Sequence, residues 1–232
     1  MALRARHLLA GLVFVGLAMR TVGSGFGLQL DGRWTGPWHP DEVTWVAAYL
    51  WPDLNTHYLY YGTLHIYLLF LLNVLFYLGA KFLGVSVHLD YKAFIWNTEA
   101  ARYLIARGVS VLAGAATIVA MQRIGARLFG RRAGWIAAIL TLATPTGVVD
   151  SHYATVDAAF MLWCLLSYYA CWRVFERGET RDYALAALFM GLAIGTKYNG
   201  GMLVFMFYLA HGLGARGRGR TWGEAVADLR WF

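Results

Sequence analysis

Two adjacent carboxylates, Asp41 and Glu42, stand in the stretch GPWHPDEVTW at residues 36–45. A carboxylate with limited access to bulk water can take a proton from a hydroxyl group, which makes this pair a candidate general base. The alternative is that both acids only favour the N-terminal end of a short helix through its dipole. The flanking residues Trp38 and Trp45 are typical of a membrane–water boundary, and they favour chemistry at that boundary.

A second polar group lies in SHYATVDAAF at residues 151–160, where His152 precedes an apolar run and Asp157 falls inside it. An ionisable residue within an apolar span is costly and usually marks a functional site, although an acid near a helix end can also reach water. His152 is either a proton carrier or ligand, or a hydrogen-bonding residue at the boundary. We interpret both residues as site candidates.

Four cations, Arg20, Arg102, Arg107 and Lys197, lie at or within the ends of apolar runs, away from the arginine-rich loops. Long basic side chains at such places often only reach towards the lipid headgroups. Four cations beside several acids would also form a phosphate-binding site.

The segment HYLYYGTLHIYLLF at residues 57–70 brings an aromatic group close to the acids in sequence. Its residues Tyr60, Tyr61 and His65 are candidates for lining a sugar or lipid pocket. The alternative is that they anchor the chain at the membrane boundary.

The composition shows which elements must position these residues. Hydrophobic residues make up 59% of the 232 and charged residues only 14%, against about 25% charged in soluble domains. Apolar runs approach the length of about 20 residues that a spanning helix needs. The sequence therefore predicts an all-α integral membrane protein, and the formal charge of +7 indicates orientation in the bilayer and not nucleic-acid binding.

About six transmembrane helices are predicted. We expect them at residues 8–28, 103–122, 133–150, 154–172, 183–197 and 199–214.

The apolar run at residues 64–83 decides the topology. Arginine-rich segments prefer the cytoplasm, and if 64–83 spanned, the basic loop at 122–132 would lie outside. We therefore expect an interfacial or re-entrant helix at 64–83 and a cytoplasmic N-terminus. A large first extracytoplasmic loop from about 29 to 102 then carries the acids.

The whole chain, residues 1–232, is predicted to be one transmembrane module of a multi-pass protein. Its last residues, TWGEAVADLRWF, indicate a cytoplasmic amphipathic helix with no clear stop. We expect it to be the N-terminal part of a longer protein in a bacterial plasma membrane.

These residues resemble the polyprenyl-phosphate-sugar-dependent glycosyltransferases of the GT-C fold, akin to protein O-mannosyltransferases and aminoarabinose transferases. The order and spacing of four features carry the resemblance. They are Arg20 followed by Asp41-Glu42, YYGTLHIY at 60–67, RGVSVLAG at 107–114 leading to GARLFGRRAG at 125–134, and SHYATVD at 151–157 before GLAIGTKYNG at 191–200.

The resemblance implies transfer of a sugar from a polyprenyl-phosphate carrier to a protein, lipid or glycan acceptor on the extracytoplasmic face, with inversion at the anomeric carbon. Asp41 would then deprotonate the acceptor hydroxyl and Glu42 would position it. The carrier phosphate would be held by Arg20, Arg107 and Lys197, and the site would be completed by His152 and Asp157. These roles also fit the chemistry apart from the resemblance. Displacing a phosphate requires charge stabilisation of the departing oxygens, and activating a hydroxyl requires a nearby base.

Two other classes stay open. A multi-pass transporter or proton-coupled protein would use Asp157, Arg107 and Lys197 as a relay, and a membrane scaffold would use the acids only as helix caps. No metal site is predicted, although a divalent cation shared by Asp41 and Asp157 is left open because oxygen ligands suit it.

Overall fold

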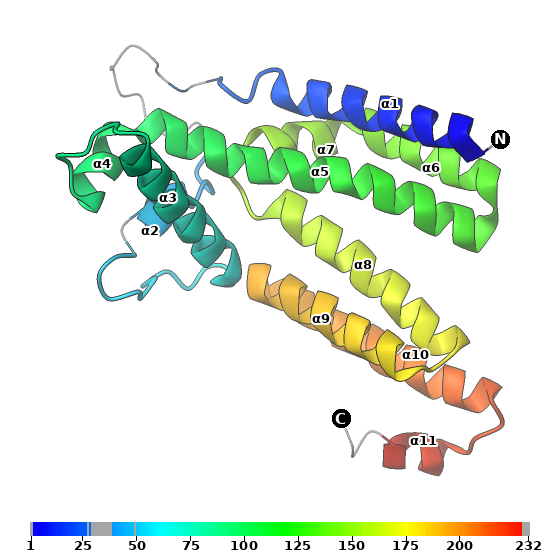
Figure 1. Ribbon diagram of the computed structural model, residues 1–232. Helices are drawn as coiled ribbons and strands as arrows, with labels where there is room; N and C mark the ends of the chain where they lie inside the picture. The colour runs from blue at the N-terminus through cyan, green and yellow to red at the C-terminus, as the bar shows by residue number, and fades with distance from the viewer. Residues whose placement is uncertain (1, 27, 29–38, 49, 229–232) are drawn as a thin grey trace. The chain divides into compact units, whose positions relative to one another are not determined.

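The computed structural model describes residues 2–26, 28, 39–48 and 50–228. These residues form helices joined by turns, with no strand among them (Figure 1), and the predicted all-α class is confirmed. Two compact units, Met1–Ala159 and Phe160–Phe232, are treated separately below. Trp38, the side chain of Trp45 and residues 229–232 of the predicted C-terminal helix lie outside the described part.

The first unit is built on seven α-helices and one 3-10 turn among its described residues, and α8 begins at its end. They are α1 (Ala2–Thr21), α2 (Thr44–Ala48), α3 (Leu64–Phe82), α4 (Tyr91–Asn97), α5 (Glu99–Phe129), α6 (Arg131–Ala143), α7 (Pro145–Val149), η1 (Asp150–His152) and α8 (Asp157–Glu176).

Helix α5 is the centre of the first unit. It packs against α6 and α1, which run alongside it (Figure 1), and it also contacts η1. The turn into α6 is made by Gly130 with φ +90°, a conformation that favours glycine. The two helices then approach so closely that a Cβ on Gly134 would come within 2.7 Å of the backbone nitrogen of Ala126. Small residues therefore allow this hairpin to form.

Three helices are long and apolar enough to cross a membrane among the described residues: Leu64–Phe82, Glu99–Phe129 and Asp157–Glu176. The first of these is the helix that we expected at the interface. Its length and composition also suit a span, so its interfacial position and the number of spans stay predictions.

The predicted span 133–150 is two helices, α6 and α7, bent by 61° at a break. Pro145 has no backbone N–H to continue the helix, and it disfavours the helical conformation for the residue before it. Thr144 accordingly has an extended backbone, with ψ 115°. The break precedes the turn η1, which carries His152.

The second unit is a set of helices joined by short connections. It continues α8 and contains α9 (Thr180–Thr196), the 3-10 turn η2 (Tyr198–Met202), α10 (Leu203–Gly217) and α11 (Trp222–Asp228).

A buried histidine connects three of these helices. The Tyr183 hydroxyl on α9 donates to Nδ1 of His211 on α10 over 2.6 Å. Nε2 of His211 donates to the carbonyl of Ala225 on α11 over 2.8 Å. Both ring nitrogens are therefore satisfied, and the short helix α11 is fixed to this unit.

Candidate active site

Asp41 and Glu42 lie in a turn just before α2. The backbone N–H of Asp41 donates to Nδ1 of His39 over 3.2 Å, and the N–H of Glu42 donates to the carbonyl of His39 over 3.2 Å. The turn separates the two acids: Glu42 is 1% exposed, whereas Asp41 is half-buried. Of the two, Asp41 is the carboxylate that an external molecule can reach.

Glu42 forms a buried ion pair with Arg107 of α5. Its Oε1 accepts from Nε of Arg107 over 2.8 Å, and its Oε2 accepts from Nη2 over 3.1 Å. The two side chains are 0% and 1% exposed. Bidentate pairs of this kind are strong and directional, and we refer to this one as the Glu42–Arg107 clamp.

The clamp also holds two further segments. Nη1 of Arg107 donates to the carbonyls of Ser24 and Phe26 over 2.7 and 2.9 Å. Oε1 of Glu42 accepts from the backbone N–H of Ala154 over 2.8 Å. Four of the five guanidinium N–H groups are thereby used, and the turn that carries Asp41 is fixed to α5.

Tyr61 places Asp41 and Asp157 in one neighbourhood. Partial burial raises the pKa of Tyr61 to about 12, and a hydrogen bond with Asp41 and the charges of Asp41 and Asp157 act in the same direction. Burial, followed by the charge of Asp41, also raises the pKa of Tyr58. The Tyr61 hydroxyl therefore stays protonated at neutral pH, and it donates to the Asp41 carboxylate.

Asp157 is the first residue of α8 and lies close to α3. Its charge acts on His65, a buried residue of α3. The segment before Asp157 is fixed to α5, because Ser110 Oγ donates to the carbonyl of Thr155 over 3.4 Å. The structure thus brings Asp41, Tyr61, His65 and Asp157 together from three separate parts of the sequence.

Arg20 lies inside the first unit, with only 1% of its surface exposed. Its Nη1 donates to the carbonyl of Gly16 over 3.3 Å and its Nη2 to the carbonyl of Thr141 over 3.2 Å. In a continuous helix that second carbonyl would accept from the N–H of residue 145, but Pro145 has none. Arg20 therefore supplies the donor that the break in the helix removes.

We expect Arg20→Met to lower the free energy of unfolding by about 1–3 kcal/mol, because it leaves the partly buried carbonyl of Thr141 without a donor. The loss should be smaller in a Pro145→Ala background, where the backbone N–H of residue 145 can replace the guanidinium. Denaturant unfolding of the four proteins in detergent measures this difference. Equal losses in the two backgrounds would show that Arg20 does not compensate for the proline.

Three other predicted site residues have different surroundings. Arg102 donates from Nε to the carbonyl of Ile95 over 2.9 Å, at the end of α4. Tyr60 is 81% exposed, and its ring lies 5.2 Å from that of Tyr58. Lys197 follows α9 in the second unit. The substrate-binding roles of Arg102, Tyr60 and Lys197 stay predictions.

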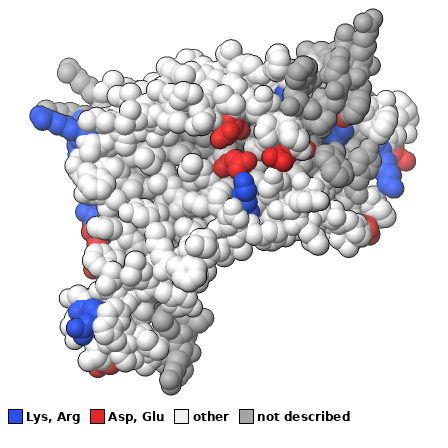
Figure 2. Space-filling view, turned by 180° about the vertical axis from the view of Figure 1, so that it is seen from behind, with Lys and Arg blue, Asp and Glu red and all other residues white. Residues whose placement is uncertain are grey.

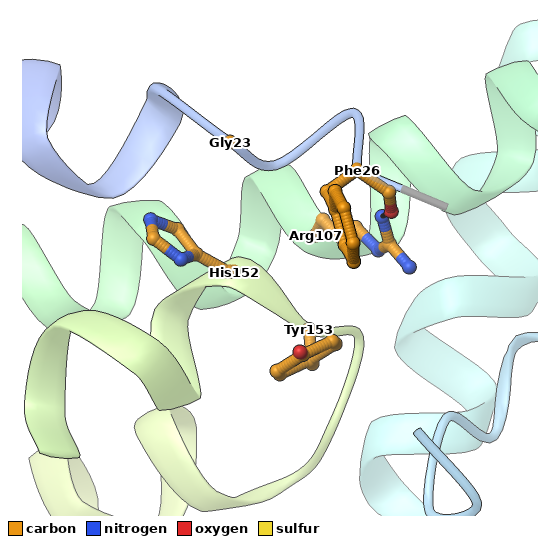
Figure 3. A pocket seen from close by; sticks show the side chains of 5 residues that line it. All are labelled: Gly23, Phe26, Arg107, His152 and Tyr153. Atoms are coloured by element: carbon orange, nitrogen blue, oxygen red, sulfur yellow. Dashed lines mark hydrogen bonds between the residues drawn. The ribbon is translucent and has the colours of Figure 1, made fainter. Parts of the chain in front are cut away.

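A pocket of about 210 Å³ opens beside the clamp. The described residues that line it are Gly23, Phe26, Arg107, His152 and Tyr153, as Figure 3 shows.

The Tyr153 ring connects this pocket to the acidic turn. Its centroid lies 5.0 Å from that of His39, and it also lies under the guanidinium of Arg107 at 5.8 Å. The sequence predicted His152 and Arg107 as site residues but missed Tyr153, Gly23 and Phe26. Tyr153 had a signal, because it stands next to His152 in the motif SHYATVD, whereas Gly23 and Phe26 are brought there only by the turn after α1.

A sequence model of the dolichyl-phosphate-mannose-protein mannosyltransferase family matches residues 100–224, more than half of the 232 residues. The chain belongs to this family. The predicted resemblance to GT-C glycosyltransferases is confirmed, and so is the coarser prediction of a membrane glycosyltransferase family. No curated protein and no solved structure matches the chain.

Only some of the candidate site residues of this mannosyltransferase-family chain lie within the segment that the family model matches. Arg102, Arg107, His152, Asp157 and Lys197 fall inside the matched segment. The acids Asp41 and Glu42 precede it, as do Arg20, Tyr60, Tyr61 and His65. Physical contact joins the two groups, since the clamp fixes the turn before α2 to the matched helix α5.

The described residues provide no preformed metal site in this member of the family. Within the described ranges, no group of three or more His, Cys, Asp or Glu side chains lies together so as to hold an ion. A divalent cation shared by Asp41 and Asp157 would need oxygen ligands from elsewhere, such as a substrate phosphate. This alternative stays open.

Proposed function

We propose that this chain transfers a mannosyl group from a polyprenyl-phosphate carrier to an acceptor hydroxyl on the extracytoplasmic face of the membrane. The observation that carries this proposal is the half-buried Asp41 beside Tyr61 and Asp157, on a turn held by a buried ion pair. The family match supports the reaction class. A protein, lipid or glycan can supply the hydroxyl.

Asp41 accepts the proton of the acceptor hydroxyl as that oxygen forms a bond to the anomeric carbon of the sugar. The bond between the anomeric carbon and the phosphate oxygen breaks, and the electron pair leaves with the polyprenyl phosphate. The hydrogen bond from Tyr61 orients the Asp41 carboxylate, and Asp157 and His65 line the same region. Inversion at the anomeric carbon follows from a single displacement.

The cations have different roles in this proposal. Arg107 acts through Glu42 as a positioning residue, because the clamp uses four of its donors, and Arg20 holds the break between α6 and α7. Stabilisation of the departing phosphate, which needs a cation, is assigned to Lys197, as the resemblance implies. Because the proposed active face is extracytoplasmic, the N-terminus is cytoplasmic in this proposal. The charge pattern of the loops supports this orientation.

The surface is consistent with a protein surrounded by lipid. Charged side chains are few in the space-filling view, where most of the visible surface is neither acidic nor basic (Figure 2). Leu71, Leu75 and Leu78 of α3 are each more than half exposed. In water such a surface would be unfavourable, whereas in a bilayer it is the expected one.

The test is transfer of radiolabelled sugar by membranes that contain the chain. Polyprenyl-phosphate mannose is compared with polyprenyl-phosphate glucose and a nucleotide-sugar donor, and each is offered with a serine- and threonine-containing peptide, a lipid and a glycan acceptor. We expect label from polyprenyl-phosphate mannose only, and transfer from polyprenyl-phosphate glucose instead would contradict the assignment of the sugar. Transfer from the nucleotide sugar alone, or from no donor, would contradict the proposal.

A further inference from the structure

We propose that the pocket formed by Gly23, Phe26, Arg107, His152 and Tyr153 binds a neutral sugar ring, and we call it the Arg107 pocket. This inference rests on the proposed function, because it assigns one part of a sugar-containing substrate to one place in the structure. The size, charge and hydrogen-bonding capacity of the pocket each support it.

The volume suits one ring. The Arg107 pocket measures about 210 Å³, below the range of roughly 300–1,000 Å³ that is usual for drug-sized ligands. A complete lipid-linked donor is much larger than a drug-sized ligand. The pocket can therefore accept a monosaccharide ring or a phosphate group, and its polar groups decide between them.

The charge of the pocket argues against a phosphate. Among the described residues that line the pocket, Arg107 contributes the only Lys or Arg side chain, and its guanidinium is paired with the carboxylate of Glu42 through two hydrogen bonds. The positive charge is thereby balanced within the protein. What remains for a ligand is the fifth guanidinium N–H, which can donate to a neutral oxygen.

His152 offers the complementary acceptor. Its Nε2 lies 3.1 Å from the carbonyl of Met19, and since a carbonyl only accepts, Nε2 is the donor. In the neutral ring Nδ1 is then an acceptor. It lies 4.0 Å from the position that a Cβ on Gly23 would occupy, so the absence of a side chain at Gly23 leaves room in front of it.

A donor and an acceptor in one pocket match a hydroxyl group. A sugar hydroxyl can donate to Nδ1 of His152 while another hydroxyl accepts from Arg107, whereas a phosphodiester offers acceptors only. The rings of Phe26 and Tyr153 supply apolar walls, which is typical of small-molecule sites with a few oriented polar groups. Tyr153 also contacts His39, whose ring accepts from the backbone of Asp41, so the pocket borders the proposed base.

The ring can come from the donor or from a glycan acceptor, and binding to the full chain in lipid nanodiscs distinguishes them. The probes are a short isoprenyl phosphate mannose, the same isoprenyl phosphate without sugar, and methyl α-mannoside. For a donor sugar, we expect the wild type to bind the mannosyl phosphate about tenfold more tightly than the bare phosphate, as one or two hydrogen bonds predict. For a glycan acceptor, the methyl mannoside should bind and the two phosphates should be equal.

His152→Ala should remove the preference for the sugar-containing probe and leave the affinity for bare isoprenyl phosphate unchanged. Gly23→Ala should do the same by filling the space before Nδ1. Its φ of +94° makes any side chain strained there, so the matched control is Gly130→Ala, which has φ +90° and open space around it. That control should retain the preference of the wild type.

Each other outcome has a distinct meaning. An equal loss for the mannosyl and the bare phosphate in His152→Ala would place the phosphate in the pocket and overturn the inference. The inference would also be overturned if His152→Ala and Gly23→Ala both kept the wild-type preference for the sugar-containing probe. If the wild type binds neither phosphate but binds methyl mannoside through His152, the sugar pocket stands and the proposed donor fails. Binding of no probe to the wild type would overturn both.

Discussion

Sugar transfer by the Asp41→Asn variant should fall at least about 100-fold below that of the wild type, because an amide cannot accept the proton of the acceptor hydroxyl. General bases contribute roughly 10²- to 10⁴-fold to such reactions. The substitution keeps the size of the side chain, and Asp41 is only half-buried, so the fold should be retained. The measurement is the initial rate of transfer from polyprenyl-phosphate mannose at matched amounts of protein.

Asp53→Asn is the matched control for this result. Its side chain is 61% exposed, and it lies between α2 and α3, on the other side of α2 from Asp41, where it contacts only Asn55 and His57 among the contacts described. We expect its transfer rate to equal that of the wild type. If Asp41→Asn also transfers at the wild-type rate, Asp41 is not the base, and Asp157→Asn becomes the next variant to measure.

Composition alone predicted the helical membrane class, since a charged fraction of 14% leaves few other folds for a chain of this length. The Asp41-Glu42 pair could also be singled out as a site candidate, because adjacent acids are costly beside apolar segments, and its role in catalysis stays a prediction. What could not be predicted was their separation into an accessible and a buried carboxylate. That depends on Arg107, which is 65 positions away from Glu42, and sequence spacing does not specify such a contact.

Sequence spacing also could not predict the hydrogen-bond partners of the cations. Arg20, Arg102 and Arg107 were grouped because each is a cation near the end of an apolar run, yet in the structure each donates to different backbone carbonyls. Residue type shows that a cation is present but not which acceptors surround it. Pro145 was a readable signal, since proline ends helices, and it accounts for the orphaned carbonyl that Arg20 meets.

The second large effect concerns the stability of the Glu42–Arg107 clamp. We expect Arg107→Met to lower the free energy of unfolding by about 3–5 kcal/mol, because it leaves a buried carboxylate without its counter-ion. The carbonyls of Ser24 and Phe26 lose their donor as well. For a chain of this size the midpoint of thermal unfolding in detergent should fall by roughly 6–20 °C. Asp53→Asn, which breaks only an exposed contact with His57, should leave the midpoint unchanged.

The double variant Glu42→Leu/Arg107→Met shows whether the Glu42–Arg107 clamp only stabilises the fold or also positions Asp41. Replacing both members of a buried ion pair by apolar residues is often neutral for stability, so its unfolding midpoint should recover towards that of the wild type. The N–H of Ala154 would still lack its acceptor, which makes full recovery unexpected. Transfer should remain low, because the turn that carries Asp41 is no longer fixed to α5. A double variant with restored stability and wild-type transfer would mean that the clamp holds the fold together without positioning the base.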